Sequence, residues 1–208
     1  MGRYEELMAA FAACRETAET RPLTLGEAFA SFKESGFVFI CVLQALPFLQ
    51  PVVLGPIATA LGLSLAVLGW QMARGRPSPW LPAKVAGWAP GPAVWRRLFT
   101  VATKVLGFFR RFTRPRMQAW VSGDRGRRAG GLMIAAAGLL ISLPLAGIPF
   151  NNALPALAVV SVALGELEED GFMLVAAFFA LVVTVLYFTA LALLLVYAGG
   201  AAFERLGF

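Results

Sequence analysis

Two adjacent asparagines, Asn151 and Asn152, stand in the segment "IPFNNALP" within a long uncharged stretch. Their amides can donate and accept hydrogen bonds, which suits a polar ligand, although one of them can instead cap the helix that follows. The flanking Pro149 and Pro155 interrupt helical hydrogen bonding and leave backbone polar groups without partners. We therefore predict that these four residues line a substrate-binding site where an apolar segment turns.

A second interruption falls at residues 46–56, "LPFLQPVVLGP", which contain Pro47, Gln50 and Pro56. In lipid, backbone groups freed at such a break are tolerated only where protein or a wet cavity covers them. We predict that the two breaks meet near the middle of the membrane and build one polar site.

Basic residues offer a further chemistry. Arg114 and Arg116 lie in "FRRFTRPRM", and the planar guanidinium suits a phosphate because it donates two hydrogen bonds at once. We predict that these two arginines form an anion-binding rim; the alternative is that they only set topology and rest on lipid headgroups. The acidic run at residues 166–170 is expected to be a solvated turn between helices rather than a cation site.

Other chemistries find no support. The chain has no histidine, no phosphate-binding loop with Lys-Ser or Lys-Thr, and no serine elbow. Cys14 and Cys41 are expected to be free thiols. We therefore expect neither an enzyme, nor a cofactor, nor a metal site. Because no Asp or Glu lies within an apolar block, a proton-coupled antiporter is disfavoured.

The elements that position these residues are set by hydropathy. The chain is 59% hydrophobic and 14% charged, and residues 35–73, 129–165 and 171–203 contain no charged side chain. Three such blocks predict a single all-α integral membrane domain over residues 1–208. Residues 171–198 lack an internal proline and predict an ordinary transmembrane helix.

The first two blocks share a layout. Each has an apolar arm, a proline-rich break and a second arm, with Pro47 and Pro144 offset by 97 residues and Pro56 and Pro155 by 99. The arms are short for full crossings. We predict two repeated, re-entrant helical hairpins at residues 36–73 and 130–170, related by pseudo-twofold symmetry. The alternative is two slightly short helices joined by an outer loop.

Charge orients the chain. Thirteen Lys or Arg and one acid lie between Arg74 and Arg128, so residues 74–129 are expected to be a cytoplasmic interfacial segment. Within it, residues 94–112 predict an amphipathic helix with five apolar side chains inward: Leu98, Phe99, Val101, Val105 and Phe108. Residues 1–35 predict amphipathic helices on the membrane surface, with a capping box formed by Thr24 and Glu27.

Several segments, in order, resemble the ExoD family of bacterial membrane proteins: "LTLGEAFASFKESGF", "ALPFL", "LGLSLAVLGWQMARGRPSPWLP", "RPRM" and "IPFNNALPALAVVSVALGELEEDG". The resemblance covers residues 23 to about 195. It implies a multi-pass protein of the bacterial inner membrane with a link to exopolysaccharide synthesis, and it does not imply an enzyme.

Three functions remain open at this stage. The first is a transporter or flippase-like handler of an anionic lipid-linked or polysaccharide precursor, with membrane lipids and polyprenyl phosphate as candidate partners. The second is an ion transporter for envelope or pH homeostasis. The third is a non-transporting scaffold for polysaccharide enzymes. A homo-oligomer is compatible with each of them, and nucleic acid is not an expected partner.

Overall fold

The computed structural model describes residues 3–32, 35–49, 55–121, 123–145 and 148–205 of the 208-residue chain. The regular secondary structure of these residues is all helical, with no strand, which confirms the all-α prediction. The helices, in chain order, are α1 (Arg3–Thr20), α2 (Leu25–Phe32), α3 (Ser35–Ala45), η1 (Leu46–Leu49), α4 (Pro56–Ala73), α5 (Ala83–Ala86), α6 (Pro92–Phe109), η2 (Arg110–Phe112), η3 (Gln118–Trp120), α7 (Gly123–Ser142), α8 (Ala153–Glu168) and α9 (Gly171–Arg205).

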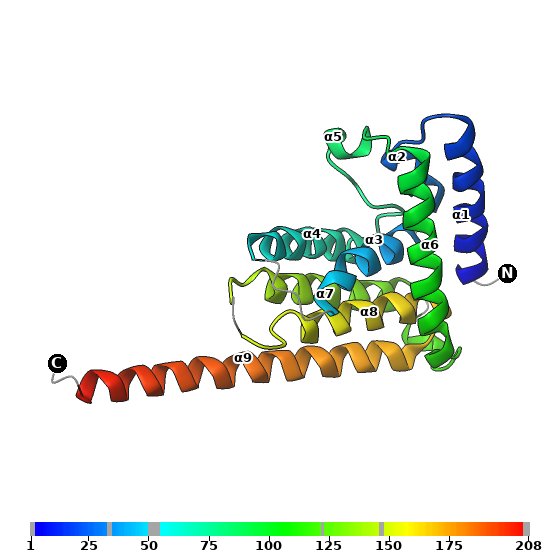
Figure 1. Cartoon of the computed structure of the whole chain (residues 1–208). Helices are drawn as coiled ribbons and strands as arrows, with labels where there is room; N and C mark the ends of the chain where they lie inside the picture. Colours follow the sequence, from blue (N-terminus) through cyan, green and yellow to red (C-terminus); the bar gives the residue numbers. More distant parts are fainter. Residues whose placement is uncertain (1–2, 33–34, 50–54, 122, 146–147, 206–208) are drawn as a thin grey trace.

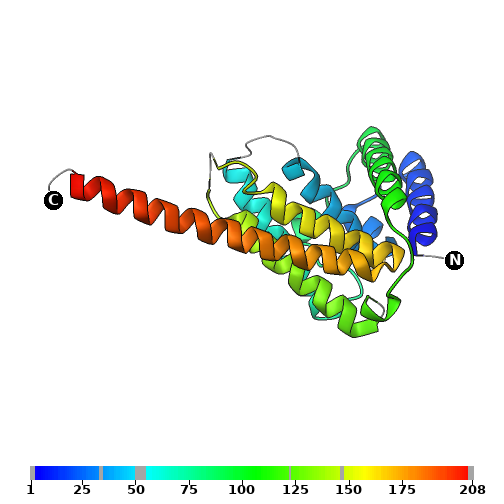
Figure 2. The ribbon, with the colours of Figure 1, turned by 90° about the horizontal axis from the view of Figure 1, so that it is seen from below.

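The helices form a bundle with a layer across one end. Helices α3, α4, α7, α8 and α9 run along a common direction, whereas α1 and α6 stand across it at the N-terminal end (Figure 1). Both helical hairpins, α3–α4 and α7–α8, turn at the opposite end, and α9 continues beyond them toward the C-terminus (Figure 2). The helical arms thus fall within the predicted hairpin segments, whereas residues 50–54 and 146–147 of the two turns lie outside the described residues.

Helices α4 and α7 pack backbone against backbone through paired glycines. A Cβ atom added at Gly62 would lie 2.8 Å from the carbonyl oxygen of Gly138, and one added at Gly131 would lie 2.7 Å from that of Gly69. Both helices carry the same pattern, glycine-x₃-small-x₂-glycine-x₃-small, at residues 62–73 and 131–142. Small residues at this spacing allow two helix axes to approach closely.

This pairing joins the second arm of the first block to the first arm of the second block. In the predicted repeat, by contrast, the equivalent helices are α3 and α7, because each is the first arm of its block. Helix α3 has 11 residues and ends in a 3₁₀ turn, whereas α7 has 20 residues. The described helices therefore do not show the predicted equivalence of the two hairpins.

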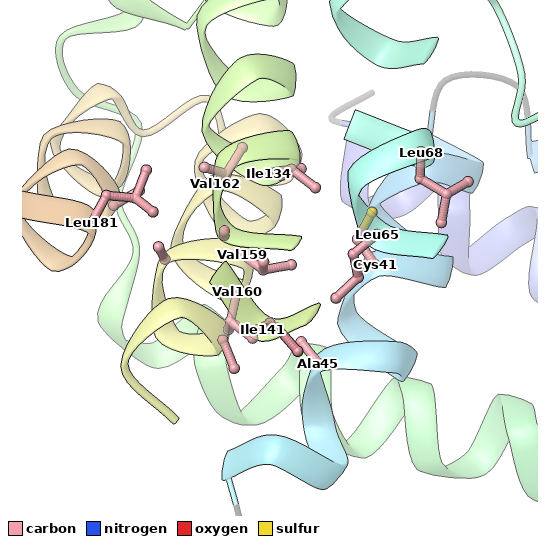
Figure 3. Packing of buried hydrophobic residues seen from close by; sticks show 14 of the residues in the cluster. Cys41, Ala45, Leu65, Leu68, Ile134, Ile141, Val159, Val160, Val162 and Leu181 are labelled. Atoms are coloured by element: carbon pink, nitrogen blue, oxygen red, sulfur yellow. The ribbon is translucent and has the colours of Figure 1, made fainter. Parts of the chain in front are cut away.

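The centre of the bundle is apolar. Leu65 of α4, Ile134 and Ile141 of α7 and Val159 of α8 are all at most 1% exposed and form one cluster with α3 and α9. Figure 3 shows these side chains interdigitating with Cys41 between the helices. Close packing of this kind leaves little room for a polar path through the described part of the bundle.

A second core lies under the layer at the end. Helix α1 buries Leu7, Phe11, Cys14 and Ala18, and α6 buries a stripe of the same spacing that comprises Trp95, Phe99, Ala102 and Leu106. Phe11 lies 5.1 Å from Phe32 and 5.2 Å from Phe99, measured between ring centroids. The two stripes therefore seal α1 and α6 against each other and against α2.

Two sequence predictions for this layer need correction. In α6, Val101 and Phe108 are 43% and 54% exposed, so the inward face differs from the predicted one. In α2, Phe29 and Phe32 pack against protein, so the prediction that this apolar face rests on the membrane surface is wrong. Both errors have one cause. The membrane surface was expected to cover these apolar faces, whereas in the structure α1 covers them.

The capping box is confirmed. The Thr24 hydroxyl accepts a hydrogen bond from the Glu27 N–H at 3.2 Å, and the Glu27 carboxylate accepts one from the Thr24 N–H at 3.1 Å. These two bonds satisfy donors that the first turn of α2 would otherwise leave open.

Two helices among the described residues are long and apolar enough to cross a membrane, by length and composition: Pro56–Ala73, with 44% of its residues buried, and Gly171–Tyr197, with 11% buried in an apolar window of 18 residues. This supports an association with the membrane. Cys14 and Cys41 are both buried free thiols, as predicted.

Candidate functional site

The second turn uses its asparagines to hold itself together. The Asn151 side chain donates to the Leu145 carbonyl at 2.7 Å and accepts from the Asn152 N–H at 2.8 Å. Asn152 occupies the N-cap position of α8, but its side chain makes no capping bond. Pro155 is buried in the first turn of that helix. The amide of Asn152 is therefore the one available to a ligand.

This turn is also tied to α9. The Tyr187 hydroxyl donates to the carbonyl oxygen of Pro149 at 2.8 Å. Phe150, between the tie and the asparagines, has a φ of 59° and is 71% exposed. A non-glycine residue at positive φ is uncommon, so the turn holds an apolar ring outward in a defined backbone shape.

The first turn is described in part. Pro47 is half-buried in η1, which packs against α8, and Pro56 is the exposed first residue of α4. Gln50 lies outside the described residues. Both turns occupy the same end of the bundle, as the prediction of one joint site requires.

Arg114 and Arg116 lie at the other end of the bundle. They contact the C-terminal end of α8, whereas the asparagines precede its first residue, and α8 has 16 residues, or about 24 Å at roughly 1.5 Å per residue. The structure therefore places the predicted arginine rim at the opposite end of α8 from the asparagines.

Arg116 belongs to a group of contacts at the corner between α8 and α9, where Asp170 lies. Its Nε lies 3.0 Å from Oδ1 of Asp170, a carboxylate with 0% exposure, and its guanidinium carbon lies 4.3 Å from the centroid of the Phe172 ring. The Arg116 carbonyl accepts from the Gly171 N–H at 2.8 Å. Arg114 contributes its backbone N–H to Asp170 at 3.1 Å, and the residue is exposed.

The acidic run is not the solvated turn that the sequence predicted. Glu166 is 5% exposed and its Oε2 lies 3.0 Å from a guanidinium nitrogen of Arg3, and Oε1 of Glu168 lies 3.4 Å from Nε of Arg110. Burial raises the pKa of Glu168, and the nearby Arg110 opposes this shift. The run therefore anchors α1, α6 and the "RPRM" segment to the corner between α8 and α9.

A cavity of about 10 Å³ lies beside this corner, lined by residues that include Arg3, Ser35, Arg127 and Glu166. It has room for about one water molecule. The described residues include no group of three or more His, Cys, Asp or Glu arranged to hold a metal ion. The corner is thus a structural joint rather than a ligand pocket.

A larger pocket of about 370 Å³ opens on the surface between α2, α5 and the "GRPSPWLP" segment. Its lining comprises Gly26, Arg76, Pro77, Ser78, Pro79, Trp80, Leu81 and Ala86. Sequence reasoning noted this segment only for its resemblance to a family. The available signal was an arginine and a tryptophan separated by prolines, which stiffen a loop around exposed polar groups.

The pocket loop is fixed to both helices of the glycine pair. The Gln71 side chain of α4 accepts from the Trp80 N–H at 2.6 Å and donates to the Trp80 carbonyl at 3.3 Å. Arg127 of α7 donates to the carbonyl oxygen of Arg76 at 2.5 Å. The pocket therefore has a preorganised wall.

Comparison with known proteins identifies the chain's relatives. The family described as "Exopolysaccharide synthesis, ExoD" matches residues 7–190. A curated relative, "Protein ExoD" of Rhizobium meliloti (strain 1021), is 32% identical over 169 residues, which make up 81% of this chain and 70% of the relative. The chain belongs to the ExoD family.

The ExoD match confirms the predicted resemblance and links the chain to exopolysaccharide synthesis. The range matched by the ExoD family takes in both turns, the corner at Asp170 and the surface pocket, and it stops within α9. No solved structure matches this fold.

Proposed function

We propose that this protein of the ExoD family lies in the bacterial inner membrane and handles an anionic precursor of exopolysaccharide, lipid-linked or polysaccharide, as a transporter or flippase does. The observation that carries the proposal is the surface pocket at the basic end of the bundle, which sets Arg76 and Trp80 at the end of α4, one of the two described helices long and apolar enough to cross a membrane. Such a site suits a ligand that has a charged head and a lipid tail.

Helix α9 supports the membrane location. Consecutive residues near its end are exposed all round, among them Leu193 at 66%, Leu195 at 62% and Val196 at 74%. A helix that is apolar on every side requires lipid or a partner around it. Lipid is the simpler cover for the bare part of this helix, whose apolar run of 27 residues exceeds the roughly 20 that suffice to cross the hydrocarbon core.

Helix α6 supports a membrane surface at the basic end. It lies across the bundle direction (Figure 1), and its outward face alternates apolar with basic side chains at helical spacing. Residues on this face are Val94, Arg97, Val101, Lys104, Phe108 and Arg111. Anionic headgroups fit such a face, and the positive-inside rule then assigns this end to the cytoplasm.

The hairpins fit a re-entrant arrangement. Tyr187, which bonds the second turn, lies 16 residues into α9, or about 24 Å from its start, whereas the apolar run continues to Tyr197, or about 39 Å. If α9 crosses the bilayer, the turn stops about 15 Å short of the end of this run. We therefore propose that the second hairpin dips into the membrane and returns to the cytoplasmic side.

Nothing in the described core favours ion transport. The cluster between α3, α4, α7, α8 and α9 consists of apolar side chains, and the buried acids Glu166 and Asp170 face arginines at one end. A scaffold role stays open because the bare part of α9 also suits a partner helix.

The test uses the purified full chain in proteoliposomes that contain a fluorescent polyprenyl phosphate. We expect binding, and an increase in the rate of its movement between leaflets over that in protein-free liposomes. Ion flux without lipid movement would instead support an ion transporter. A polysaccharide enzyme that co-purifies, while both assays stay at the protein-free level, would replace the proposal with a scaffold.

A further inference from the structure

We infer that the surface pocket binds a glycosyl phosphate: Arg76, Ser78 and the backbone N–H of Gly26 hold the phosphate, and the Trp80 ring covers the sugar. This inference rests on the proposed function and names the ligand class of its site. The pocket, at about 370 Å³, falls within the range of about 300–1,000 Å³ that small-molecule sites occupy.

One backbone donor at the start of α2 is open. The N–H groups of Leu25, Glu27 and Ala28 donate to the Trp88 carbonyl, the Thr24 hydroxyl and the Thr24 carbonyl, respectively. The Gly26 N–H makes no hydrogen bond to any other residue that the structure describes, and Gly26 lines the pocket. An open amide in the first turn of a helix favours an anion. The absence of a side chain at Gly26 lets Ala86 pack against this turn, since an added Cβ would lie 3.2 Å from the Ala86 carbonyl oxygen.

Arg76 brings a guanidinium whose charge no described carboxylate compensates. Its side chain is exposed, but its backbone is fixed: the N–H donates to the Gln71 carbonyl at 3.2 Å, and the carbonyl accepts from Arg127. An arginine whose backbone is held in place and whose guanidinium is exposed is suited to bidentate contact with a phosphate. The half-buried Ser78 adds a hydroxyl on the same wall.

Trp80 supplies a flat apolar surface. Both of its backbone groups bond to Gln71, while its side chain is 57% exposed. An indole held at a pocket mouth has an apolar face for the C–H groups of a sugar ring and an N–H donor for a hydroxyl. A free phosphate makes no use of this face, so the tryptophan points to a sugar next to the phosphate.

One acid lies close along the chain to this donor set. Glu27 follows Gly26, and its carboxylate would repel a phosphate if it were uncompensated. It accepts hydrogen bonds from the Arg21 guanidinium at 3.1 Å and from the Thr24 N–H at 3.1 Å. Its charge is therefore engaged away from the open amide.

The experiment measures ligand affinity for the full chain in nanodiscs of zwitterionic lipid, by calorimetry. The probes are inorganic phosphate, a hexose, a hexose 1-phosphate and polyprenyl phosphate. Two substitutions have matched controls. Arg76→Gln is compared with Arg74→Gln, which removes the same charge two residues away, where Arg74 stacks on Trp70 outside the pocket lining. Trp80→Ala is compared with Trp88→Ala, since both side chains are 57% exposed.

We expect Arg76→Gln to weaken the binding of every phosphate probe about tenfold or more, because a charge-assisted hydrogen bond is lost, and Arg74→Gln to change it less than about twofold. Trp80→Ala should weaken hexose 1-phosphate about tenfold and leave inorganic phosphate unchanged. Trp88→Ala should change neither. Unfolding temperatures of all variants are measured alongside, so that a loss of fold is not taken for a loss of binding.

The probes also separate the two sources of this chemistry. Polyprenyl phosphate carries no sugar, so tighter binding of it than of hexose 1-phosphate would favour a lipid phosphate and remove the sugar from the inferred ligand. The reverse order would support a soluble glycosyl phosphate. Equal loss in Arg76→Gln and Arg74→Gln would overturn the pocket in favour of a diffuse basic surface. Phosphate binding without lipid movement in proteoliposomes would leave this inference standing and remove the proposed transport. Lipid movement that does not depend on Arg76 would support the proposed transport and overturn the inferred role of the pocket.

Discussion

The guanidinium of Arg116 lies 3.0 Å from the fully buried carboxylate of Asp170, across 54 residues of chain. The same carboxylate also accepts from the backbone N–H groups of Arg114 and Phe172, at 3.1 Å and 3.0 Å. Asp170 thus fixes the segment that follows α6 to the point where α9 begins, beside the ion pairs of Glu166 and Glu168.

Asp170→Ala should destabilise the protein by about 3 kcal/mol or more, because it leaves buried donors without an acceptor. Arg116→Gln should cost less, about 1–2 kcal/mol, because the Arg116 side chain is 45% exposed and two backbone donors remain. Thermal unfolding in detergent measures both. Equal losses would mean that the ion pair, rather than the backbone bonds, holds the corner.

The same corner tests the predicted anion-binding rim. Arg114 uses only its backbone at Asp170, so Arg114→Gln should leave stability unchanged. If the Arg114 side chain binds a substrate, this variant should reduce exopolysaccharide output in cells at normal protein levels. Unchanged output would leave the surface pocket as the anion site.

Gly69→Ala should destabilise the α4–α7 pair by about 1–3 kcal/mol, since the new Cβ would clash with the backbone of Ala135 and Gly131. Gly107→Ala is the matched control: this residue also lies inside a helix, and the nearest atom to an added Cβ is the Tyr4 hydroxyl oxygen at 3.9 Å. Alanine there should stabilise α6 by up to about 1 kcal/mol. The same sign at both sites would contradict the close backbone packing.

The capping box predicts a pH dependence. The Thr24 backbone N–H, with help from Arg21, lowers the pKa of Glu27 below its ordinary value of 4.5. The contribution of Glu27 to stability is therefore fully present above pH 4.5 and is lost as the pH falls through the lowered pKa. The difference in unfolding temperature between the wild type and Glu27→Gln should shrink below that pH. A constant difference would show that the carboxylate charge is not involved.

The two asparagines should separate structure from function. Asn151→Ala removes two hydrogen bonds of the turn and should cost about 1–2 kcal/mol, whereas Asn152→Ala removes none from its side chain and should leave stability unchanged. Loss of polysaccharide output in Asn152→Ala, at normal expression, would therefore report a ligand at the turn. Full output in both variants would remove the turn from the candidate sites.

Sidedness can be measured with single cysteines at Ser78 and Gly207, after Cys14→Ser and Cys41→Ser. Ser78 lies in the pocket wall at the basic end, and Gly207 lies outside the described residues. If α9 crosses the membrane once, as proposed, the two positions should label from opposite sides of intact cells. Labelling from the same side would contradict a single crossing.

The sequence predicted those features that depend on residues close together along the chain. The capping box needs partners three residues apart, and the helical arms follow from uncharged runs, so both were recognisable. The acidic run was misread because the partner of Glu166 lies 163 residues away, at Arg3. Such a pairing leaves no trace in a periodic pattern.

The face of α6 shows a different difficulty. Val101 and Phe108 recur at helical spacing, as do Trp95 and Phe99, so the sequence allows either stripe to face inward. The structure selects the second stripe because α1 presents Phe11 to it. The surface pocket was missed for a similar reason, since its wall forms only once Gln71 and Arg127 hold the loop from two helices.

The glycine pair has a consequence for how this protein is made. Helix α4 leaves the ribosome before the basic segment and before α7. In the proposed membrane arrangement, its glycine face therefore enters the membrane before the α7 backbone against which it packs. The first hairpin cannot reach its final packing during its own insertion. This packing is completed only after the second hairpin is made. A nascent chain that stops before Gly131 therefore leaves the glycine face of α4 without its partner helix. The order of synthesis thus governs assembly, and without the second hairpin the first has no helix to pack against.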